Sequence, residues 1–269
     1  MSLSSILFLF LTHLGVGLSL VLAWVGKDAG VKFFRFNAGT AALLIAAGFA
    51  LRPNAQTEYA TLHRISMTAL IVAEAALVIY WATIGRMLAR VRPAILWAAI
   101  LCGLAGVIAQ ALEVSATAPG LMPLLTVASF LSSTALLGGA CGAMVLGHWY
   151  LVVPSLNVSH LQSIVKLHIG SLVVRAVVVL AAVIIAIVTW QPGMGPNFQR
   201  YIMSTAGIFF WQRILFGLAG PGLLSYLTWE TAKIQSTQSA TGILYVDFFT
   251  VIVGEVLASY LLLSTTIPL

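Results

Sequence analysis

Charged side chains are scarce in this sequence, and their scarcity excludes most soluble folds. Of its 269 residues only 7% are Asp, Glu, Lys or Arg, whereas 61% are hydrophobic. Together with a mean hydropathy of +1.05, this is the composition of a protein that crosses a membrane several times. We expect a single integral membrane domain over residues 1–269, because no segment is polar enough to form a separate soluble domain.

Cysteine and catalytic motifs are almost absent as well. Cys102 and Cys141 lie in different hydrophobic runs without CxxC or Cys/His spacing, so neither a zinc site nor a disulfide framework is indicated. The chain has no nucleophile motif and no cofactor-binding loop, so we expect partner subunits to complete any redox chemistry. Residues 1–5 contain no Lys or Arg, so we interpret the first hydrophobic run as a retained span and not as a secretory signal.

Eight long hydrophobic runs predict eight transmembrane helices. Each has about twenty residues or more, enough to cross a hydrocarbon core of about 30 Å at about 1.5 Å per residue. The runs cover residues 4–25, 33–51, 65–85, 94–115, 122–147, 162–190, 201–227 and 241–264. Because the runs show no barrel-type alternation, the predicted fold class is an all-α, polytopic transmembrane helical bundle. In the seventh run, Gly217 and Gly220-Pro221-Gly222 predict a kink.

Basic residues predict the orientation of the bundle. The connections after runs one, three, five and seven, with the first turns of the runs that follow, carry Lys27, Lys32, Arg35, Arg86, Arg90, Arg92, Lys166 and Lys233. The other side carries only Arg52, Arg64 and Arg200. Since cytoplasmic loops are enriched in Lys and Arg, both termini are expected on the non-cytoplasmic side. The net charge of +6 belongs to these loops, so we expect contact with membrane lipid headgroups and no nucleic-acid partner. The expected location is the bacterial cytoplasmic membrane.

The most informative feature is a set of ionisable residues within or just inside the hydrophobic runs. They are His13, Glu74, Glu113, His148, His168, Arg175, Arg213, Asp247 and Glu255. Each charge placed in a bilayer costs roughly 2.5 kcal/mol or more, so the set has either a functional role or internal partners.

Three of these groups suit a quinol site in the outer half of the bundle. His63 and Glu74 are eleven residues apart and face the same side of a helix, about 16 Å apart along its axis. His13 reaches a depth between them. Imidazole and carboxylate groups can accept the two protons that a quinol releases on oxidation. Alternatively, Glu74 forms a buried salt bridge with Arg175 or Arg213.

Two histidines in the inner half are candidate haem ligands. His148 closes the fifth run and His168 lies about two turns into the sixth, so neighbouring antiparallel helices can bring the two imidazoles together. Two neutral imidazoles are the ligand set of a b-type haem, and Arg175, one heptad after His168, can meet a propionate or a quinone carbonyl. Alternatively, His148 simply faces lipid headgroups.

The last run contains two carboxylates, Asp247 and Glu255. Eight residues separate them, which corresponds to about 80° around the helix and about 12 Å in depth. Such a pair can relay protons, and it can equally neutralise Arg213 and Arg175. The sequence leaves both roles open.

Several short motifs give the chain a family resemblance. Gly138-Gly139 in the fifth run, Trp211-Gln212-Arg213 before the Gly/Pro break, and Gly254-Glu255 in the last run resemble the quinone-interacting membrane anchors of the dimethyl sulfoxide reductase and polysulfide reductase type. The resemblance implies a menaquinone or ubiquinone site near the outer face, served by His63 and Glu74, and an iron-sulfur or cytochrome partner. The sequence departs from that family after Glu255, where the usual arginine is absent.

The function expected from the sequence is therefore that of a membrane subunit of a respiratory or photosynthetic electron-transfer complex. Such a subunit binds quinone, with haem b as a further candidate cofactor, and anchors redox partners. Two alternatives stay open: a structural or assembly subunit without its own cofactor, and a proton-coupled secondary transporter. The lack of an internal repeat argues against the transporter.

Overall fold

The computed structural model describes residues 2–53, 59–153, 156–190 and 197–269. Within these ranges the chain is helical apart from short connections, and no strand occurs. Among the described residues, eight helical units are long and apolar enough to cross a membrane. The predicted all-α, eight-span bundle is confirmed.

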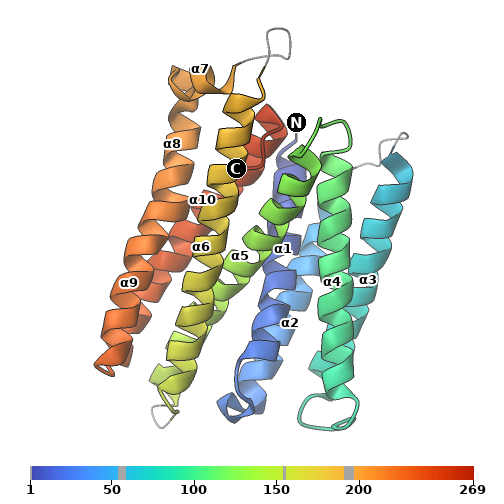
Figure 1. Cartoon of the computed structure of the whole chain (residues 1–269). Coiled ribbons are helices and arrows are strands. Elements are labelled where there is room, and N and C mark those ends of the chain that lie inside the picture. The colour runs from blue at the N-terminus through green and yellow to red at the C-terminus, as the bar shows by residue number, and fades with distance from the viewer. Residues whose placement is uncertain (1, 54–58, 154–155, 191–196) are drawn as a thin grey trace.

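Six of the spans are single regular helices close to their predicted limits. They are α1 (Leu3–Trp24), α2 (Gly30–Ala50), α3 (Ala60–Thr83), α4 (Arg92–Val114), α6 (Ser159–Val188) and α10 (Thr237–Thr265). Helix α5 (Met122–Val152) is longer than predicted. It continues past Gly147 for more than another turn and crosses the bundle obliquely (Figure 1).

The seventh span differs most from its predicted limits of 201–227. A short helix, α7 (Phe198–Ile202), and a 3₁₀ turn (Thr205–Gly207) precede it, so the span begins only at Ile208. It consists of α8 (Ile208–Ile214), a π-helical segment (Leu215–Ala219) and α9 (Gly220–Lys233). The Gly/Pro sequence thus interrupts the regular helix through a π-helical segment, a feature that often occurs at functional positions.

Both termini lie at one end of the bundle, which we call the outer end (Figure 1). The opposite, basic end carries the connections with Lys27, Arg86 and Arg90. Helices α1 and α5 form the centre and are the most buried spans. Helices α2, α3 and α4 pack on one side of this pair, and α6, α9 and α10 pack on the other.

Glycine allows the two central helices to touch. A Cβ atom on Gly17 of α1 would lie 2.1 Å from the carbonyl oxygen of Thr134 on α5. A Cβ on Gly138 would lie 2.2 Å from the carbonyl of Gly17. Small residues at such crossings let helix backbones approach closely in a membrane, where helix packing has no hydrophobic driving force.

We predict that Gly138→Ala destabilises the bundle by about 1–3 kcal/mol, because the added methyl group overlaps the α1 backbone. Thermal unfolding in detergent measures the loss. Gly170→Ala is the matched control, since no atom lies within 4 Å of its added Cβ. If both variants melt with the wild type, the close α1–α5 contact is wrong.

Candidate functional site

A buried ion cluster joins three helices in the outer half of the bundle. Arg175 of α6 donates from Nε and Nη2 to the two carboxylate oxygens of Glu255 on α10, at 3.1 and 3.0 Å. Arg213 of α8 donates from Nη2 to the same carboxylate at 2.9 Å. All three side chains are at most 2% exposed. The Arg175 fork is bidentate, which is the strongest geometry for such a pair.

Polar groups around Arg175 complete its hydrogen bonding. Its Nη1 donates to the hydroxyl of Ser129 at 2.6 Å and to the Ser129 carbonyl at 3.1 Å. Its Nη2 also donates to the main-chain oxygen of Leu269 at 2.9 Å. Arg213 is less well satisfied, because its Nε and Nη1 have no hydrogen-bond partner in the described part of the chain.

The prediction that Glu74 pairs with Arg175 or Arg213 is wrong. Glu255 pairs with both arginines instead, as the alternative role of the last span proposed. One carboxylate against two guanidinium groups leaves this cluster with an excess charge of +1.

A second buried pair lies nearer the basic end. His168 of α6 places Nε2 at 2.7 Å from Oδ2 of Asp247 on α10, and both side chains are at most 1% exposed. The atoms are within ion-pair distance but poorly aligned for a directed hydrogen bond. Along α10 this pair lies about 12 Å from the Arg175–Glu255–Arg213 cluster.

The structure does not bring the two candidate haem ligands together. His168 packs beside Gly139, whereas His148 lies nine residues further along α5, or about 13 Å by helix geometry. His148 Nδ1 instead lies 3.0 Å from the hydroxyl of Tyr245 at the bundle surface. Among the described residues no group of three or more His, Cys, Asp or Glu side chains could hold a metal ion. Haem ligation stays a prediction.

His13 is enclosed beside the central cluster. It is 2% exposed, packs edge-on against Phe130 with ring centroids 4.6 Å apart, and leaves Nε2 without a hydrogen-bond partner in the described chain. The space that it shares with Ser129, Arg175 and Glu255 has a volume of only about 10 Å³. That is at the lower limit for one water molecule and far too small for a quinone ring.

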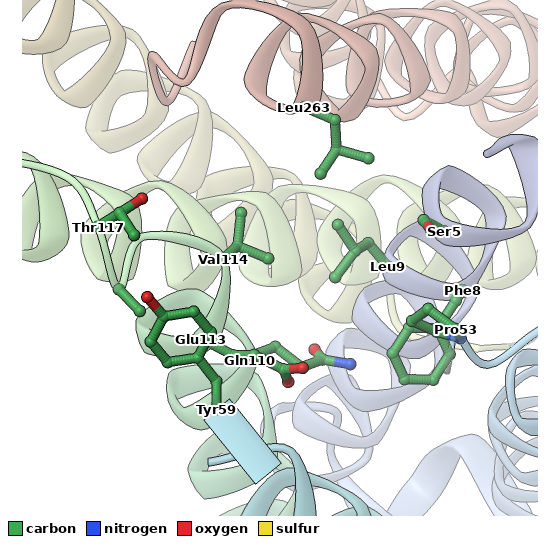
Figure 2. Close-up of a pocket in the computed structure, with 11 residues that line it drawn as sticks. Ser5, Phe8, Leu9, Pro53, Tyr59, Gln110, Glu113, Val114, Thr117 and Leu263 are labelled. Carbon is green, nitrogen blue, oxygen red and sulfur yellow. The ribbon is translucent and has the colours of Figure 1, made fainter. Parts of the chain in front are cut away.

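The outer end contains a larger pocket, of about 330 Å³, between α1, α4 and α10 (Figure 2). Its lining residues include Ser5, Phe8, Leu9, Tyr59, Gln110, Glu113, Val114 and Leu263. Behind Glu113, its Oε1 lies 3.0 Å from Nδ1 of His63 on α3, and both side chains are partly exposed. Gln110 continues inward, donating to Thr12 next to His13 at 3.3 Å.

The sequence analysis noted Glu113 but assigned it no role, and it missed Gln110 and Tyr59. Gln110 and Glu113 are three residues apart, a spacing that places both on one face of α4 and could have indicated a shared site. Glu74, which was grouped with His63, lies elsewhere. It lines a groove between α2 and α3, nearer the basic end, and has no hydrogen-bond or ion-pair partner in the described chain.

Comparison with known proteins identifies no relative: no protein-family model, curated protein or solved structure matches the chain.

We predict that Glu255→Gln destabilises the bundle by about 3–5 kcal/mol, because it leaves two buried guanidinium groups without a counter-charge. Thermal unfolding in detergent measures the loss. Glu230→Gln removes an exposed pair with Lys233 and should change stability by less than about 1 kcal/mol. Equal melting of the two variants would mean that the cluster contributes nothing.

Proposed function

We propose that the chain is an integral membrane subunit of an electron-transfer complex that binds a quinol in the outer pocket. The observation that carries the proposal is the position of Glu113, which forms part of the pocket wall with the His63 imidazole behind it. A carboxylate within reach of a bound hydroxyl group, with a second titratable group beyond it, is the arrangement that general-base catalysis requires.

The chemistry assigns each group a step. Oxidation of a quinol to a quinone releases two electrons and two protons. Glu113 accepts the first proton from a quinol hydroxyl and passes it to His63 across the 3.0 Å contact. The Glu113 carboxylate is then free to accept the second proton. The Gln110 amide lies on the same wall and can bond the other ring oxygen. The two electrons leave to an iron-sulfur or cytochrome partner, because the chain itself carries no redox motif.

Size and polarity also support the proposal. A volume of about 330 Å³ falls at the small end of ligand pockets. Phe8, Leu9 and Val114 offer apolar contact to a ring, while Gln110 and Glu113 of α4 supply polar groups. The pocket lies at the end of the bundle that the charge distribution predicts to be outside a bacterial cytoplasmic membrane, so its protons would be released there.

A structural or assembly subunit is the second candidate. The mutual pairing of Arg175, Arg213 and Glu255, and of His168 and Asp247, favours it, because these groups find their partners inside the bundle without a ligand. The two functions differ at the outer pocket, since only the first requires Glu113 to be a base.

We predict that Glu113→Gln lowers quinol-dependent electron transfer by about 10²-fold or more, since removal of a positioned base costs 10²–10⁴-fold. The assay uses the purified complex, or short-chain ubiquinone and menaquinone analogues for binding to the chain alone. His63→Gln should lower the rate less and shift its pH profile.

Glu74→Gln is the matched control for Glu113→Gln, because it removes a carboxylate that lies outside the outer pocket. It should leave quinone binding unchanged. Full activity in Glu113→Gln contradicts the proposal, and so does selective loss in Glu74→Gln. Reduced-minus-oxidised absorption spectra of the same preparation test the separate haem prediction. That prediction requires a b-type cytochrome band in the wild type and loss of the band in His168→Gln.

A further inference from the structure

A second cavity, distinct from the outer pocket, opens between α2 and α3. It has a volume of about 600 Å³ and is walled mainly by apolar side chains. Phe36, Leu43, Val78 and Trp81 line it and are each more than 40% exposed. In a transmembrane bundle these surfaces face lipid, so the groove is open to the hydrocarbon of the membrane.

Gly39 lets Trp81 pack directly against α2 in this groove. A Cβ atom at this position would lie 2.9 Å from Nε1 of Trp81, so the indole lies directly over the glycine. Trp81 comes three residues before the C-cap of α3, at the depth where tryptophan prefers the membrane interface. The groove therefore runs from the interface into the apolar region, as a lipid chain does.

Two cations stand at the interfacial end of the groove. Lys32 and Arg35 lie in the first turns of α2 and line it. Arg35 donates from Nη2 to the carbonyl of Ile84, at 2.6 Å, which holds the guanidinium across the ends of α2 and α3. Lys32 is exposed and makes no ion pair within the described chain.

The surrounding surface reinforces this positive charge. Lys27 and Arg92 line a neighbouring cavity of about 500 Å³, and Arg86 and Arg90 lie in the connection between α3 and α4. Two acidic residues lie at this end, Asp28 in the turn before α2 and Glu230 in the last turn of α9, and both have partners. Asp28 pairs with His160 at 2.9 Å, and Glu230 pairs with Lys233 at 2.7 Å. In the described chain, neither of these carboxylates forms an ion pair with Lys32 or Arg35.

We propose that the α2–α3 groove is a binding site for an anionic phospholipid of the inner leaflet. Lys32 and Arg35 bind the phosphate-bearing headgroup, and an acyl chain lies along Phe36, Gly39 and Leu43. Basic pockets between transmembrane helices at the cytoplasmic side are suited to such headgroups. Guanidinium and ammonium groups both bond phosphate oxygens, and the low polarity around them strengthens the contact.

Glu74 distinguishes a phospholipid from other candidate ligands of this groove. Its carboxyl group lies nine residues inside the end of α3, about 13 Å along the helix, beside the acyl-chain region of the groove. A hydrocarbon chain offers it no hydrogen bond, so phospholipid binding does not require this group. A ligand with a hydroxyl or amine at that depth, by contrast, would depend on it.

Quenching of Trp81 fluorescence by brominated phospholipids tests the site in the full chain. The Trp81 signal is the difference between wild type and Trp81→Phe. Brominated phosphatidylglycerol should quench it at concentrations about tenfold lower than brominated phosphatidylcholine with the same chains, and added salt should reduce this preference. Equal quenching by the two lipids would overturn the proposal.

Charge variants provide the second arm. Lys32→Gln/Arg35→Gln should abolish the preference for phosphatidylglycerol. Arg86→Gln/Arg90→Gln removes the same amount of charge from the same end of the bundle but outside the groove. This variant should retain most of the preference for phosphatidylglycerol. Equal loss in both variants overturns the proposal in favour of a diffuse surface effect.

Glu74→Gln supplies the third arm and separates the candidate ligands. It should leave phosphatidylglycerol binding unchanged. Abolition of binding by this substitution overturns the phospholipid assignment and indicates a hydrogen-bonding guest at mid-groove. These results do not depend on quinol activity, so they test the lipid site independently of the proposed function.

Discussion

The contact on which the outer half of this bundle depends is the carboxylate of Glu255 between the guanidinium groups of Arg175 and Arg213. It fixes α6, α8 and α10 at one depth, because each charge would be costly in a membrane without the others. Close packing makes the contact possible. A Cβ on Gly254 would lie 2.2 Å from Cα of Gly217, and one on Gly217 would lie 1.7 Å from Nη1 of Arg213. The π-helical segment contains Gly217 and so shapes the wall around Arg213.

Mutual pairing of the buried charges limits where a ligand can bind. Glu255 pairs with Arg175 and Arg213, and Asp247 pairs with His168 about 12 Å away along α10. The space beside His13, Arg175 and Glu255 has a volume of only about 10 Å³, which is at the lower limit for one water molecule. Two cavities in the other half, of about 330 and 600 Å³, include Glu113 and Glu74 in their linings. A further cavity of about 630 Å³ between α5 and α6 is lined by no carboxylate or imidazole. Acid–base chemistry with a ligand is therefore better supported near α1–α4 than at the central arginines.

The sequence was sufficient for the fold because hydrophobic length and loop composition are local signals. The spans were predicted to within a few residues, except where α5 extends past Gly147 and where α7 delays the seventh span. The partners of buried charges were not predictable, because they depend on how helices rotate and tilt. Glu74 and Glu255 were equally good partners for Arg175 in the sequence, and only the packing of α6 on α10 selects Glu255. In the same way, His63 was matched to Glu74 on its own helix, whereas it pairs with Glu113 across the α3–α4 contact.

A double-mutant cycle between Arg213 and Glu255 tests this account most directly. Thermal unfolding in detergent is compared for the wild type, Arg213→Met, Glu255→Gln and the double variant. If the carboxylate stabilises the bundle by compensating two buried cations, Glu255→Gln leaves both arginines without a counter-charge. Arg213→Met then removes one of these two charges, so the double variant is more stable than Glu255→Gln alone. Additive losses would show that the two side chains act independently and would contradict the central role of the cluster.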